Sequence, residues 1–145
     1  MKVNVEIASE YKDPYAVIYT DTMSDEISRA VEILREGAPA PITAVKVDET
    51  MVLKPQDVFL VRIENEKTVV YTEKEKCISK RRLYEISEQL GSGFMQISKS
   101  TLVNLSCLDR IESDFGGAII VKLKNGLCDY VSRKYLPGFK KYLGM

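Results

Sequence analysis

The chain has 145 residues, no histidine, and equal numbers of acidic and basic side chains, 21 of each. Its apolar share of 45% is enough for one domain with a packed core, or for a domain and a short arm. Without histidine there can be no Ser-His-Asp or Cys-His catalytic set, and the commonest general base near neutral pH is missing. No phosphate-binding glycine loop occurs either, since Gly91-Ser92-Gly93 is only a turn. We therefore expect that the protein is not an enzyme.

The cysteine pattern argues against a structural role for metals or disulfides. Cys77, Cys107 and Cys128 are widely spaced and form no C-x-x-C pair. This favours reduced, partly buried thiols, with a redox switch as the alternative, and we expect no metal and no cofactor. No apolar run approaches the roughly 18 residues of a membrane span, and the N-terminus lacks the apolar stretch of a secretory signal. We therefore expect the protein in the cytoplasm.

The balanced total charge conceals a separation along the chain. Residues 1–41 carry four basic and eight acidic side chains, whereas residues 42–145 carry 17 basic and 13 acidic ones. A basic segment with an acidic appendage suits binding to a polyanion. A solvated, mildly basic tail is the alternative that charge alone leaves open.

Residues 1–41 predict a small β-β-α arm. Alternation over residues 2–7 and the run 16–19 indicate two short strands, separated by Asp13-Pro14. Ser24 can cap a helix whose apolar stripe continues until Gly37, and the prolines in 38–41 predict a linker. A unit of this size is too small to be stable alone, so we expect it to be a dimerisation or regulatory element.

Residues 42–145 predict a second, mainly β unit. Its candidate strands are short runs between polar turns: Ile42–Val47, Thr50–Lys54, Val58–Glu64, Lys67–Thr72, Lys76–Ser79, Phe94–Ile97, Thr101–Val103, Leu108–Glu112, Ile119–Leu123 and Cys128–Val131. A hairpin is predicted around Asn65-Glu66, and Asn125-Gly126 predicts a type I′ turn. Ser79 is a candidate cap for a helix that ends at Gly91, and Tyr135–Leu143 predicts a short closing helix.

Several motifs in this unit occur in a recognisable order. The central one is Gly93–Leu105 (GFMQISKSTLVNL), followed by Arg110–Glu112, Val121–Gly126 and Tyr130–Leu136. Upstream lie Asp57–Glu64 and Arg82–Ile86. Together they resemble the LytTR family of DNA-binding domains over residues 42–143. The resemblance implies a mainly β (α+β overall), elongated antiparallel fold without a helix-turn-helix, and a transcriptional regulator that contacts DNA major grooves through its loops.

The same resemblance implies three DNA-contacting loops: one near Lys67, one at Ser98-Lys99-Ser100, and one at Arg133-Lys134. The residue types fit this role. A lysine at a turn tip can approach phosphate and release condensed counterions, and an arginine can make a two-pronged contact with guanine. Serine hydroxyls are short donors to the DNA backbone. The alternative for the lysines is that they are ordinary solvated charges. A residue such as Asn104 more often hydrogen-bonds to the backbone of its own turn than contacts a base.

The family's usual phosphoacceptor receiver domain does not fit into the 41 residues before this unit. We expect that the arm makes a homodimer, because its unpaired strands would be covered by a symmetric partner. It could also bind a regulatory protein. Two further readings stay open: a protein-interaction module whose basic loops bind an acidic protein, and a ligand sensor with a pocket between the arm and the β unit.

Overall fold

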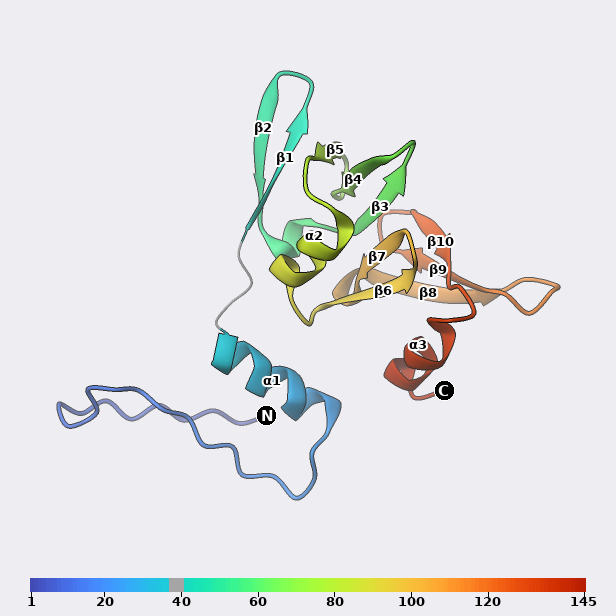
Figure 1. The fold of residues 1–145 in the computed structure, drawn as a ribbon. Helices are drawn as coiled ribbons and strands as arrows, with labels where there is room; N and C mark the ends of the chain where they lie inside the picture. The colour runs from blue at the N-terminus through green and yellow to red at the C-terminus, as the bar shows by residue number, and fades with distance from the viewer. Residues whose placement is uncertain (37–40) are drawn as a thin grey trace.

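The main body of the protein is a seven-stranded antiparallel sheet (Figure 1). The computed structural model describes residues 1–36 and 41–145. Within them the strand order of this sheet is β2-β1-β5-β4-β3-β7-β6. Its strands are β1 Ile42–Lys46, β2 Glu49–Leu53, β3 Leu60–Glu64, β4 Lys67–Tyr71, β5 Lys76–Ser79, β6 Phe94–Ser98 and β7 Thr101–Asn104. Helix α2 (Leu83–Leu90) connects β5 to β6.

A second, three-stranded antiparallel sheet follows, with the order β10-β9-β8. It consists of β8 (Leu108–Ser113), β9 (Ile119–Leu123) and β10 (Cys128–Tyr130), and α3 (Leu136–Leu143) closes the chain. The strands of both sheets lie within a few residues of the segments that alternation predicts, and α2 and α3 lie within the predicted helices. The predicted cap Ser79 is wrong, because Ser79 ends β5 and Arg82 is the N-cap of α2. The mainly β, antiparallel fold class is confirmed.

The two faces of the large sheet are buried in separate cores. On one face Val61, Val70 and Leu102 pack with Ile86 and Leu90 of α2. On the other face Leu60 and Val103 pack with Val121 of the small sheet and Phe139 of α3. The neighbours Leu60 and Val61 both have an exposed fraction of 0% because successive side chains of a strand point to opposite faces, and both faces of β3 are covered. The central strands are therefore held from both sides.

Both predicted hairpins are present, and the turn at Asn125-Gly126 differs from its predicted type. Asn65 and Glu66 have φ values of 50° and 64°, so the type I′ turn lies between β3 and β4. At Asn125-Gly126 the hairpin is present but the type I′ prediction is wrong, since only Gly126 has a positive φ, 89°. There the Asn125 side chain is engaged: its Nδ2 donates to the carbonyl of Thr72 at 3.1 Å and its Oδ1 accepts from the backbone of Leu127. These contacts hold the turn in a conformation other than type I′.

The described part of the arm contains one helix, α1 (Asp25–Glu36), and residues 1–24 contain neither helix nor strand. The helix start is confirmed, because the Ser24 hydroxyl accepts the backbone N–H of Ile27 at 3.3 Å. The two strands predicted at 2–7 and 16–19 are not formed. An extended segment becomes a strand only when another segment pairs with it, and none does so in the described chain. The predicted helix end at Gly37 and linker residues 38–40 lie outside the described residues.

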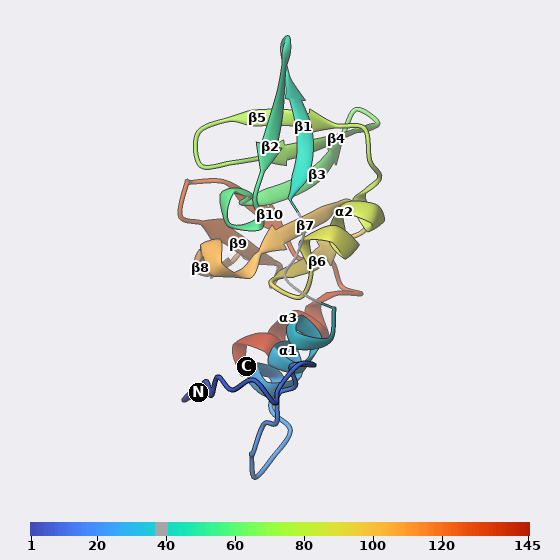
Figure 2. The same ribbon diagram turned by 90° about the vertical axis from the view of Figure 1, so that its left-hand side faces the viewer.

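Helix α1 lies beside α3 of the same chain (Figures 1 and 2). The guanidinium carbon of Arg29 is 4.7 Å from the centroid of the Tyr142 ring, a cation–π contact. Ile27 is buried, but Ile33 and Leu34 on the same helix are 46% and 60% exposed. The docking on α3 therefore covers only part of the apolar surface of α1.

Candidate nucleic-acid interface

The first basic loop is the tip of the β3–β4 hairpin. Glu64 pairs with Lys67 at the end of the two strands, directly beside the type I′ turn. The side chain of Lys67 is exposed, whereas the following Thr68 is buried in the sheet. The turn geometry therefore places Lys67 at an edge of the sheet, pointing into solvent.

The second basic loop is the β6–β7 turn at Ser98, Lys99 and Ser100. The Ser98 hydroxyl accepts the backbone N–H of Ser100 at 3.2 Å, and Gln96 Nε2 donates to the carbonyl of Lys99 at 3.4 Å. These local bonds fix the turn and leave Lys99 exposed. The backbone N–H of Ile63 donates to the Ser100 carbonyl at 2.9 Å, so this turn lies against the end of β3, next to the first loop.

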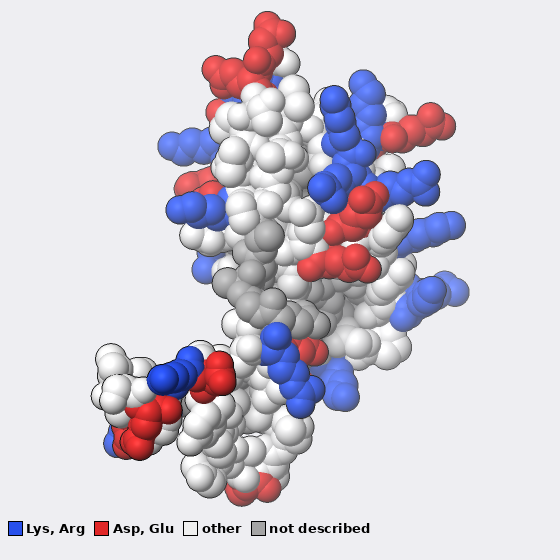
Figure 3. Space-filling model, turned by 60° about the vertical axis from the view of Figure 1, so that its left-hand side comes forward, with Lys and Arg blue, Asp and Glu red and all other residues white. Residues whose placement is uncertain are grey.

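The third basic loop, residues 131–134, joins β10 to α3. The backbone N–H of Ser132 donates to the Ile97 carbonyl at 2.8 Å, which fastens this loop to the end of β6. Arg133 and Lys134 follow and are exposed. The three loops thus form a row, which we call the basic edge: the tip at Lys67, the turn at Lys99 and the loop at Arg133-Lys134. Figure 3 shows Lys and Arg side chains gathered along the right-hand side of the molecule.

Three further basic residues belong to the same side and were not among the predicted contacts. Thr68 pairs with Ser79 in the β4–β5 ladder. The next residues, Lys80, Arg81 and Arg82, therefore leave β5 at the same end of the sheet as Lys67. All three are exposed, and Arg81 also makes an ion pair with Glu85 at 3.7 Å. In the sequence these residues are a run of three cations directly after a predicted strand, and this run could have indicated them.

A half-buried polar cluster lies under the basic edge and joins the two sheets. Asp129 of β10 accepts the Thr101 hydroxyl of β7 at 2.8 Å and pairs with Arg62 of β3 at 3.4 Å. Arg62 also pairs with Glu64 at 3.2 Å, and the Tyr71 hydroxyl donates to the same carboxylate at 2.8 Å. Asp129 therefore ties the small sheet to the strands that carry the first two loops.

The surroundings of Glu64 keep it ionised. Burial alone would raise its pKa, but the Tyr71 hydrogen bond and the charges of Arg62 and Lys76 outweigh burial and hold the pKa below its ordinary value. A carboxylate this close to the β3–β4 tip would repel phosphate if it were free. Its pairing with Arg62 and Lys76 largely neutralises it.

The structure also settles the role of Asn104, whose side chain supports its own turn. Asn104 is only 4% exposed, and its Oδ1 accepts the backbone N–H of Ser106 at 3.0 Å. Its Nδ2 donates to the carbonyl of Val58 at 2.8 Å. The prediction that this residue satisfies a local turn is confirmed.

The three cysteines are free, and they differ in their environment. Cys77 and Cys107 are buried, and burial raises the pKa of both thiols, whereas Cys128 is exposed. Within residues 1–36 and 41–145 no group of three or more Cys, Asp or Glu side chains is placed to hold a metal ion. No helix in the described part of the chain is long and apolar enough to cross a membrane.

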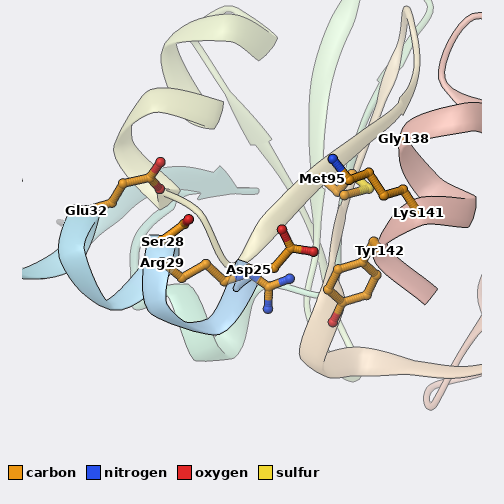
Figure 4. A pocket seen from close by; sticks show the side chains of 8 residues that line it. All are labelled: Asp25, Ser28, Arg29, Glu32, Met95, Gly138, Lys141 and Tyr142. Carbon is orange, nitrogen blue, oxygen red and sulfur yellow. The ribbon is translucent and has the colours of Figure 1, made fainter. Parts of the chain in front are cut away.

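A small open hollow lies between α1 and α3, where the sequence allowed for a ligand pocket. Its volume is about 220 Å³. Figure 4 shows the lining side chains, which carry both charges: Asp25, Ser28, Arg29, Glu32, Met95, Gly138, Lys141 and Tyr142. In the described structure no buried side-chain polar atom of this lining lacks a hydrogen-bond partner. The hollow therefore does not single out a ligand.

The fold and the site define a class of protein: a small antiparallel β domain that presents a row of cations on loops at one edge. Comparison with protein families gives the family. The LytTr DNA-binding domain model matches residues 48–144, so this chain belongs to the LytTR family. A solved LytTr DNA-binding domain from Bacillus cereus shares the fold, with a TM-score of 0.68 and 24% sequence identity over 73% of this chain and 98% of that one.

Two relatives are similar to this chain along its whole length, including the arm. An HTH-type transcriptional regulator from Staphylococcus aureus (strain bovine RF122 / ET3-1) is 28% identical over 100% of this chain and 99% of its own. A regulator of the same type from strain MSSA476 is 27% identical over the same shares. In the described chain several strands separate each helix from the next, so these helices do not form a helix-turn-helix.

Proposed function

We propose that the protein is a transcriptional regulator that binds double-stranded DNA through its basic edge, with the loops entering major grooves. One observation carries this proposal. The hydrogen bonds from Ile63 to Ser100 and from Ser132 to Ile97 align three exposed basic loops on one side of a rigid fold. Membership of a DNA-binding domain family agrees with it.

The residues of the edge divide into two roles by their chemistry. Arg133 carries a planar fork of donors that matches the two acceptors of guanine in the major groove. Lys67, Lys99 and Lys134 are point charges suited to phosphate. The hydroxyls of Ser98 and Ser100 are short donors on the same turn and suit the DNA backbone. Lys80, Arg81 and Arg82 extend the phosphate-binding surface beyond Lys67.

The second candidate function is a protein-interaction module that binds an acidic protein through the same loops. The basic edge alone would also suit such a partner. The two functions differ in what they recognise, since a DNA reader prefers particular base pairs at a fixed spacing. Selection from a library of random duplexes separates them: an enriched sequence supports a DNA reader, whereas a selection without any enriched sequence contradicts one and leaves the protein partner.

Two substitutions test the division of roles on the selected duplex. Arg133→Ala should weaken binding by about 1–3 kcal/mol and relax the base preference at one position. Lys67→Ala should weaken binding to all duplexes alike. Lys74→Ala is the matched control, because Lys74 is an exposed lysine in the loop at the opposite end of β4. If Arg133→Ala leaves the base preference unchanged, Arg133 does not read a base.

The salt dependence tests the electrostatic part of the proposal. With roughly 4–8 phosphate contacts per protomer, the logarithm of the binding constant should fall with the logarithm of salt concentration with a slope of about −4 to −7. A flat salt dependence on the best duplex would contradict binding through the basic edge. We further propose that residues 1–41 form a separate element that makes the protein a homodimer, which would set two basic edges on neighbouring half-sites.

A further inference from the structure

Residues 2–7 pair with no other segment of the described chain, and their apolar side chains are largely exposed. No backbone N–H or carbonyl of residues 2–7 makes a hydrogen bond within the described structure. Val3, Val5 and Ile7 are 75%, 79% and 95% exposed. All three are odd-numbered, so they share one face of the extended segment, with Lys2, Asn4 and Glu6 on the other. Such an apolar face is usually covered by a partner.

A second segment of the arm has the same character. Tyr15, Val17 and Tyr19 are 76%, 60% and 93% exposed, and they also alternate along the chain. Figure 1 shows the chain folding back on itself between the two segments, at the left-hand end of the arm, away from α1. The N-terminal amino group lies 3.5 Å from Glu26 of α1, so the first segment starts beside the helix. Ile33 and Leu34 of α1 are also exposed apolar side chains of the arm.

The first segment is complementary to itself. When two copies run antiparallel about a two-fold axis at Asn4, Lys2 of one copy faces Glu6 of the other, twice. The same register places Val3 opposite Val5 and Met1 opposite Ile7, again twice, and Asn4 opposite Asn4. Opposite charges and β-branched side chains are the favourable cross-strand pairs of an antiparallel sheet. Moving the register by two residues would place Lys2 opposite Ala8 and leave its charge unpaired.

We propose that residues 2–7 of two copies pair in this register and form the centre of a four-stranded sheet, with residues 15–19 of each copy as the outer strands. The odd-numbered side chains of all four strands then lie on one face, which covers the free apolar surface of the two α1 helices. This inference rests on the proposed homodimer and names the surface that makes it. It also explains why two strands that the sequence predicts are absent from the single chain.

Cysteine cross-linking tests the register. The test uses the full chain with the exposed Cys128 changed to Ser, since Cys77 and Cys107 are buried. Facing residues of an antiparallel pair have Cα atoms about 4.5–5.5 Å apart, within the range of a disulfide. Asn4→Cys should therefore form a covalent dimer on mild oxidation. Lys2→Cys, the matched control, should stay monomeric on a denaturing gel, and should cross-link only when it is mixed with Glu6→Cys.

Charge reversal gives a second test, made in the chain that keeps its three native cysteines. Lys2→Glu and Glu6→Lys should each weaken the dimer in light scattering, and an equal mixture of the two should restore it. Loss of dimer in that mixture, or equal cross-linking of the Lys2 and Asn4 variants, overturns the register. If the protein is a dimer but Asn4→Cys does not cross-link it, residues 2–7 do not form the dimer surface, and the proposed homodimer itself stands. A monomeric full-length chain overturns both, while DNA binding through the basic edge is judged separately by its salt dependence.

Discussion

Asp129 is expected to be the residue on which the alignment of the basic edge depends. Its carboxylate is 22% exposed and accepts from Thr101 at 2.8 Å and from Arg62 at 3.4 Å. Asp129→Ala removes three hydrogen bonds, from charged Arg62, from the Thr101 hydroxyl and from the exposed backbone N–H of Tyr130. It leaves the Thr101 hydroxyl, in a residue that is only 1% exposed, without its acceptor. A typical buried hydrogen bond contributes about 0.5–1.5 kcal/mol and one to a charged group about 1.5–3 kcal/mol. Loss of the two part-buried bonds, from Thr101 and Arg62, should therefore lower the free energy of unfolding by about 2–4 kcal/mol.

Urea denaturation measures this loss. With a slope of about 1–3 kcal/mol per molar urea, the midpoint should fall by about 1 M or more. Asp129→Asn keeps an acceptor for Thr101 and should recover part of the loss. Asp109→Ala is the matched control: Asp109 also pairs with an arginine, Arg110 at 2.8 Å, but both side chains are about half exposed, so no measurable change is expected. Equal midpoints for the Asp129 and Asp109 variants would refute the expectation that the fold depends on Asp129.

Two further predictions concern the β3–β4 hairpin. Glu66→Gly should raise the free energy of unfolding by about 0.5–1 kcal/mol, because Glu66 has a φ of 64° that glycine adopts without strain. It should also tighten DNA binding by removing a carboxylate beside Lys67, whereas Glu66→Ala should tighten binding without the gain in stability. The second prediction concerns pH: the lowered pKa of Glu64 stabilises the fold above the ordinary value of 4.5, and this contribution is lost as the pH falls through the lower, folded-state pKa. Glu64→Gln should therefore show a shallower loss of stability in acid, and identical acid unfolding curves would contradict this.

The local pattern of the sequence was sufficient for the elements of the β domain. Alternation and turn residues predicted its strands, and Gly91 predicted the end of α2. These features are set by nearest neighbours: the two-residue period of a strand, the period of a helix, and the residues that can end it. The motif at Gly93–Leu105 also indicated the family correctly.

The candidate site was predicted only in part, because a sequence does not show which loops are neighbours. Lys67, Lys99 and Arg133 come from separate turns, and the backbone bonds that align them connect strands far apart in the chain. Lys80–Arg82 lie on the same side because Thr68 pairs with Ser79. The contribution of Asp129 could not be predicted either, since its partners Arg62 and Thr101 are 67 and 28 residues away.

The sequence by itself determined the strands and helices of the β domain, the charge separation and the residue types of the loops, since these follow from local periodicity and composition. Tertiary structure decided the turn at Asn125, where a contact with Thr72 overrides the usual preference of Asn-Gly. It also decided the state of the arm. Residues 2–7 have the pattern of a strand, but a strand exists only when its backbone groups pair with another chain segment, and the described single chain offers none.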